Sequence, residues 1–71
     1  MLAPDDPLRP ILRAAGIRSL AAWGRRANVG RDLLKEMRRG TRAVTPTAAA
    51  RLARAAGITI EMVPTLLVRA R

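Results

Sequence analysis

The chain has 71 residues and contains neither cysteine nor histidine, which excludes disulfides and leaves no Cys or His to hold zinc. Fourteen Lys and Arg oppose five Asp and Glu, and the net charge of +9 favours a polyanionic partner: nucleic acid, an anionic membrane surface or an acidic protein. The commonest catalytic base and the strongest nucleophile are both missing. We therefore expect a binding protein and not an enzyme, with no cofactor.

The N-terminal segment is acidic and rich in proline, which is wrong for a secretory signal peptide. Asp5 and Asp6 neighbour each other there, and nothing in the sequence fixes them against a substrate. No apolar run approaches the roughly 18 residues that a membrane span needs. We expect a cytoplasmic, single-domain protein over residues 1–71, with a core at about 8–63 between short tails at 1–7 and 64–71.

The first helix is expected within Pro7–Ala15, because proline favours the first helical turn. Gly16 lies where a left-handed residue ends a helix, and Ile17 can then fold back on Leu12. No segment shows the sustained alternation of apolar and polar residues that is typical of strands. The punctuation by glycine, proline and small hydroxyl residues instead predicts an all-α chain.

Ser19 is a good N-cap for a second helix, which we expect from Leu20 to about Ala27. A third helix is expected from about Arg31 to Arg39, and Gly40 ends it. Together these segments predict two short helices that are separated by only a few residues.

The pair Thr45–Pro46 predicts an N-cap followed by proline at the first position of a fourth helix, which ends at Ala56 before Gly57. Thr59 is expected to cap a short fifth helix that Pro64 ends. Residues 65–71 are open to three interpretations: a frayed tail, a helical extension, or a strand that pairs across a dimer.

The sequence of residues 13–17, Arg-Ala-Ala-Gly-Ile, recurs at residues 54–58. A duplicated domain is one explanation. We favour the other, that two helices end with the same chemistry.

The segment from Leu20 to Arg39 is predicted to form two helices joined by a tight turn. Gly24 has no side chain at the point where the second helix must cross closely, and Asn28 falls at a bend that needs positive φ. The apolar positions are spaced to face a common core: Trp23, Ala27, Val29, Leu34 and Met37.

This order of residues resembles the helix-turn-helix of the phage repressor and Cro family, and the resemblance spans about Leu8 to Val63. Residues 16–23, Gly-Ile-Arg-Ser-Leu-Ala-Ala-Trp, look like those of small prophage regulators. Asn28 replaces the usual turn glycine and Gly30 the usual Ser or Thr cap, and glycine there weakens the cap only slightly. The resemblance implies a compact all-α, five-helix fold of the lambda-repressor type. An ordinary helical hairpin would explain the apolar spacing but not the charge on the opposite face.

The residues of the third helix that point away from its apolar side are charged: Arg31, Asp32, Lys35, Glu36 and Arg39. The resemblance implies that Gly30 and the first four of these face the floor and walls of the major groove. Arg and Lys can bridge guanine O6 and N7, and Asp and Glu can accept from cytosine N4. The alternative is a solvated face with Asp32–Lys35 and Glu36–Arg39 ion pairs.

Contacts with DNA phosphates are expected at both ends of this motif. Ser19 and the amides of its helix can hold a phosphate oxygen, or Ser19 can act as a cap alone. Thr41 and Arg42 follow the third helix, where the family commonly touches the backbone, although a solvated loop is an alternative. Arg25 and Arg26 either lie beside the groove or face water.

We therefore predict a sequence-specific regulator of transcription that binds double-stranded DNA, a repressor of a phage, prophage or mobile element. It would bind a palindromic operator as a homodimer, through Leu66, Leu67 and Val68 or through the fourth and fifth helices, with no small-molecule ligand and no membrane. The alternatives are an autoregulating antitoxin, a cationic membrane-surface protein and a module that binds acidic proteins.

Overall fold

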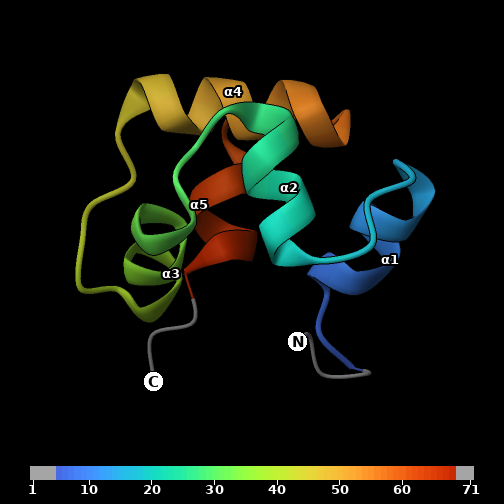
Figure 1. Cartoon of the computed structure of the whole chain (residues 1–71), viewed down its shortest axis with the longest axis horizontal. Coiled ribbons are helices and arrows are strands. Elements are labelled where there is room, and N and C mark those ends of the chain that lie inside the picture. The colour runs from blue at the N-terminus through green and yellow to red at the C-terminus, as the bar shows by residue number, and fades with distance from the viewer. Residues whose placement is uncertain (1–4, 69–71) are drawn as a thin grey trace.

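The computed structural model describes residues 5–68, in which all regular structure is helical (Figure 1). Five helices follow one another: α1 Leu8–Ala14, α2 Leu20–Ala27, α3 Arg31–Arg39, α4 Pro46–Ala56 and α5 Met62–Leu67. The prediction of an all-α chain with five helices is confirmed, and the first four helices lie where they were expected. Within residues 5–68, no helix has the length and apolarity needed to cross a membrane.

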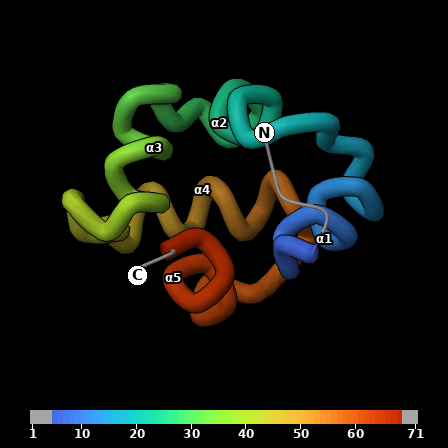
Figure 2. Tube along the Cα trace, turned by 90° about the horizontal axis from the view of Figure 1, so that it is seen from below, coloured from blue at the N-terminus to red at the C-terminus, as the bar shows by residue number. Residues whose placement is uncertain are grey.

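The longest helix, α4, lies across one side of the molecule and packs against α2 and α5, while α2 also packs against α3. Figure 2 shows α1, α2, α3 and α5 arranged around the centre, with α4 crossing behind them. Because α2 and α3 are both supported by this arrangement, the tight turn between them is held in a defined position.

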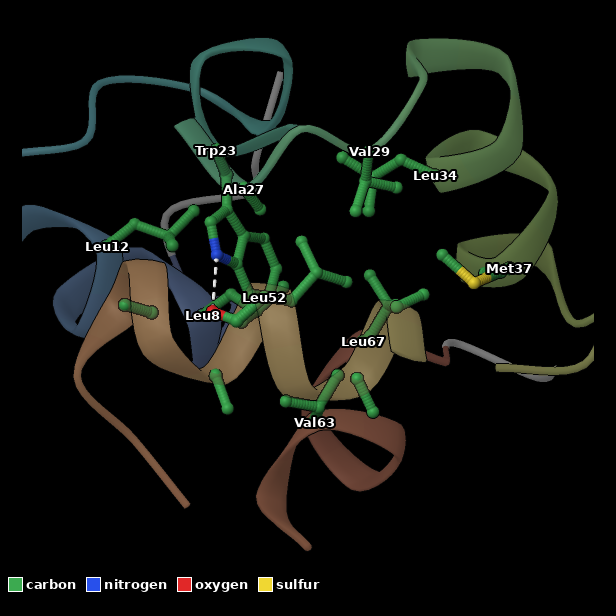
Figure 3. Close-up of a cluster of buried hydrophobic side chains, with 14 of the residues drawn as sticks. Leu8, Leu12, Trp23, Ala27, Val29, Leu34, Met37, Leu52, Val63 and Leu67 are labelled. Carbon is green, nitrogen blue, oxygen red and sulfur yellow. Dashed lines mark hydrogen bonds between the residues drawn. The ribbon is translucent and has the colours of Figure 1, made fainter. Parts of the chain in front are cut away.

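The core is centred on Trp23, the single aromatic residue of the chain. Its indole Nε1 donates a 3.0 Å hydrogen bond to the backbone carbonyl of Leu52, so its polar atom is satisfied although the ring is fully buried (Figure 3). This confirms the core position that was predicted for Trp23. Aliphatic and methionine side chains from the other four helices are fully buried with it: Leu8, Leu12, Leu34, Met37, Leu52, Val63 and Leu67.

The repeated sequence ends α1 and α4 in the same way. In each copy a left-handed glycine, Gly16 or Gly57, and the isoleucine after it donate their backbone N–H groups to carbonyls of the last helical turn. The N···O distances lie between 2.8 and 3.3 Å. The pattern is that of a Schellman motif, which confirms that the two helices end with the same chemistry.

The bounds predicted for the fifth helix are wrong. Thr59 does not cap it, because α5 begins only at Met62. Two overlapping turns, which start at Thr59 and Ile60, lead into the helix. Pro64 does not end it either, since it lies in the first helical turn. An N–H group there has no acceptor within the helix, so proline costs no hydrogen bond.

The packed part of the chain extends beyond the 8–63 that was expected. Leu67 is fully buried at the end of α5, so its side chain is not available for a contact between two copies. Leu67 therefore offers no exposed surface on a single copy, while Leu66 and Val68, the other two residues predicted for a dimer interface, are half-buried. Of the alternatives for residues 65–71, the helical extension is found as far as Leu67, and residues 69–71 lie outside the described range.

Candidate nucleic-acid interface

The residues at the two ends of α2 determine where the first helix of the predicted motif begins and stops. Ser19 has an extended backbone, and its Oγ accepts a 3.1 Å hydrogen bond from the amide of Ala22, so it caps α2 as predicted. At the other end, Asn28 has φ of 60° and ends the helix in the left-handed conformation. The chain then reverses within a few residues, and α3 begins at Arg31.

Gly24 permits the close approach that the sequence predicted. A Cβ atom at this position would lie 2.8 Å from the carbonyl oxygen of Val29 and 3.3 Å from Cδ2 of Leu34. The first of these atoms belongs to the backbone of the turn and cannot swing aside. Only glycine lets α2 lie this close to both the turn and α3.

One side of α3 is anchored in the core. Leu34 and Met37 are buried, and Leu33 is half-buried against the same cluster. Gly30 precedes the helix as its N-cap residue, with an ordinary φ of −58°, and nothing lies within 4 Å of a Cβ atom placed there. The buried side sets which residues of α3 face outward.

The outward side of α3 carries what we call the cationic row, Arg31, Lys35 and Arg39. All three are exposed, and because they are four residues apart they follow one line along the helix. Asp32 is exposed beside them. A nine-residue helix is about 13 Å long and about 10–12 Å across with its side chains, and the major groove of DNA, about 12 Å wide, admits a helix of this diameter.

Glu36 pairs with Arg42 and not with Arg39, the partner given by the alternative interpretation of this helix. Its carboxylate accepts a 2.6 Å hydrogen bond from Nε of Arg42, and its backbone carbonyl accepts one of 3.1 Å from the hydroxyl of Thr41. Neither the Asp32–Lys35 nor the Glu36–Arg39 ion pair forms in the described part of the chain. The loop after α3 therefore partly neutralises Glu36, and the cationic row stays unpaired with these acids.

A buried ion pair behind α3 was missed by the sequence interpretation. Arg38 pairs with the carboxylate of Asp6, whose residue is only 2% exposed, and also donates to the backbone carbonyl of Leu67 at 3.3 Å. Asp6, which the sequence placed in the N-terminal tail at 1–7, is therefore held in the fold by this pair. A signal was present, since Arg38 lies four residues after the buried Leu34 and so shares its side of the helix.

Further arginines lie on α2 and beside its first residues. A hollow of about 740 Å³ beside Ser19 is bordered by Arg9, Arg13 and Arg18. Arg26, for which the sequence left groove contact and solvent open, donates a 3.0 Å hydrogen bond to the carbonyl of Ala15. Arg25 is exposed. Arginines therefore lie near both ends of α2.

Comparisons with protein-family models, with curated proteins and with solved structures find no match to this chain. The resemblance to the repressor and Cro family therefore rests only on the residues of this chain, chiefly those of α2, the turn and α3.

Proposed function

We propose that this protein binds double-stranded DNA in a sequence-specific manner, with α3 in the major groove, and regulates transcription. The observation that carries the proposal is the position of the cationic row. Arg31 and Lys35 are exposed on a short helix whose opposite side, at Leu34 and Met37, is anchored in the core. A rigidly supported, exposed and cationic helix is the element that major-groove readers use.

Each member of this face has a chemical role in the proposal. Arg31 and Lys35 donate to the acceptors on guanine edges, and Asp32 accepts from cytosine N4. Arg39, at the far end of the helix, pairs with a phosphate. Glu36 orients Arg42, whose guanidinium keeps further N–H groups for the DNA backbone.

Backbone contacts would hold the duplex on either side of α3. Ser19 and the hollow beside it, with three bordering arginines, offer donors to one strand. Arg42, which keeps N–H groups beyond the one bonded to Glu36, offers donors to the other. Thr41 beside it would join this contact by turning its hydroxyl away from the carbonyl of Glu36. The open space at Gly30 lets a sugar-phosphate chain approach the start of α3.

A homodimer is part of the proposal, because one copy is too small to read two successive major grooves. The molecule measures 26 × 24 × 21 Å, whereas grooves on one side of a duplex repeat at about 34 Å. Ile60 and Met62 are 51% and 41% exposed and offer apolar surface for such a contact. A small dimeric repressor of a phage, prophage or mobile element, acting on a palindromic operator, is the protein that these features fit best.

Selection of bound sequences from a pool of random duplexes tests this function. We expect a palindromic consensus with the natural chain and its loss with Arg31→Ala/Lys35→Ala. The matched control is Arg51→Ala/Arg54→Ala, which removes the same charge from α4, outside every contact proposed for DNA, and should retain the consensus. Enrichment of no sequence, or of the same sequences by both double variants, would contradict the proposal.

A further inference from the structure

An open groove of about 840 Å³ lies between the C-terminal end of α2 and the outer side of α4. Three exposed arginines border it, Arg26, Arg51 and Arg54. None of the acidic residues in the described part of the chain borders it. We call this feature the α2–α4 groove, and its positive charge favours an anionic ligand.

Two of these arginines are held in place by the fold. Nη1 of Arg26 donates to the carbonyl of Ala15 at 3.0 Å, and Nη1 of Arg51 donates to that of Asn28 at 3.4 Å. A guanidinium has five N–H donors, so each keeps several for a ligand. Anchoring of this kind lowers the conformational entropy that binding would cost.

The remaining surface of the groove is largely apolar and made of small residues. Pro46, Ala50 and Ala55 border it along α4, with Ala27 at the end of α2. A volume of this size lies in the range of about 300–1,000 Å³ that is typical of ligand sites. A sugar-phosphate backbone has no aliphatic side chain to place on such a surface, whereas an acidic peptide has both carboxylates and apolar side chains.

The groove is also separate from the contacts proposed for DNA at Ser19. Ala27 and Asn28 border it at the opposite end of α2, and an eight-residue helix is about 12 Å long. Figure 1 shows this end of α2 beside α4.

We propose that the α2–α4 groove binds an acidic peptide segment of a partner protein. Carboxylates of that segment pair with Arg26, Arg51 and Arg54, and an apolar side chain between them covers the alanine surface of α4. The proposal stands on the groove alone and does not depend on DNA binding.

Fluorescence anisotropy with a labelled helical peptide tests it, using a probe with glutamates beside a leucine and alanine face. A second probe with Gln in place of each Glu measures the charge requirement. We expect Arg51→Glu/Arg54→Glu to weaken binding of the acidic peptide by at least about tenfold, since two charge-assisted contacts are lost. Arg31→Glu/Lys35→Glu changes the net charge equally and should bind the peptide normally but lose the duplex consensus.

Equal weakening by both double variants would overturn the proposal, because it would show attraction by net charge alone. Loss of duplex binding in the groove variant, with peptide binding unchanged, would assign the groove to DNA and overturn it too. Amide shifts of the unsubstituted protein in two-dimensional NMR decide the matter without any variant. Shifts at Arg26, Arg51 and Arg54 on addition of the peptide support the groove. Shifts only along α3, the same shifts when the protein dimerises without peptide, or no shifts at all refute it.

Discussion

Arg38 of α3 and Asp6, which precedes α1, form an ion pair that leaves 17% and 1% of their side chains exposed. The same carboxylate accepts a 3.0 Å hydrogen bond from the amide of Leu8, and Arg38 also reaches the carbonyl of Leu67. The pair thus joins the start of α1 and the end of α5 to the back of the proposed recognition helix.

Asp6→Ala should lower the free energy of unfolding by about 3 kcal/mol, because it leaves the charge of Arg38 largely buried without its partner. A core of this size supplies only about 3–5 kcal/mol, so a large fraction of the protein would unfold. Urea denaturation followed by Trp23 fluorescence measures the effect. Asp5→Ala, at the exposed neighbour, should change little, and Asp6→Leu/Arg38→Met should recover most of the loss. Equal effects of Asp6→Ala and Asp5→Ala would show that the ion pair contributes nothing.

Gly24→Ala should destabilise the fold by about 1–3 kcal/mol through overpacking, because its Cβ would lie 2.8 Å from the carbonyl oxygen of Val29. The higher helix propensity of alanine offsets part of this cost. Gly30→Ala is the control, since nothing lies within 4 Å of a Cβ there and its φ suits any residue. The same denaturation measurement applies, and an unchanged midpoint for Gly24→Ala would contradict the close approach.

Gly30→Ser should stabilise the protein relative to Gly30→Ala by about 1 kcal/mol, because a serine hydroxyl can accept from the amides at the start of α3. The natural glycine provides no side-chain cap at this position. Thermal melting of both variants measures the difference. Identical melting temperatures would show that these amides gain nothing from a cap.

Lys35→Ala should relax the preference at one base pair, removing about 1–3 kcal/mol of discrimination, if α3 reads bases as proposed. Arg42→Ala should weaken binding to every duplex about equally, because Arg42 is proposed to contact the DNA backbone. Its loss also frees the carboxylate of Glu36, which adds repulsion from phosphate. Binding profiles over a duplex library measure both effects, and an unchanged preference profile for Lys35→Ala would exclude its role in base reading.

The helices were predictable because the residues at each helix end specify by themselves where the helix begins or stops. Ser19 and Thr45 cap helices with their own side chains, and Asn28, Gly40 and Gly57 end helices in the left-handed conformation that their types favour. The outward position of Arg31 and Lys35 follows equally from their spacing against Leu34 and Met37. Interactions within one or two helical turns are enough to specify these features. The late start of α5 was missed because Thr59 is of a residue type that caps helices, and its end was missed because a proline in the first turn looks, in sequence, like a terminator.

Only the tertiary structure decided which distant groups meet. Asp6 and Arg38 are 32 residues apart, and no local pattern states that one carboxylate will be buried against one of twelve candidate cations within residues 5–68. The turn of Glu36 toward Arg42 and the α2–α4 groove likewise depend on how loops and helices pack. Residue types and spacing specify local conformation and the facing of each helix, whereas long-range pairing follows from close packing of the whole chain.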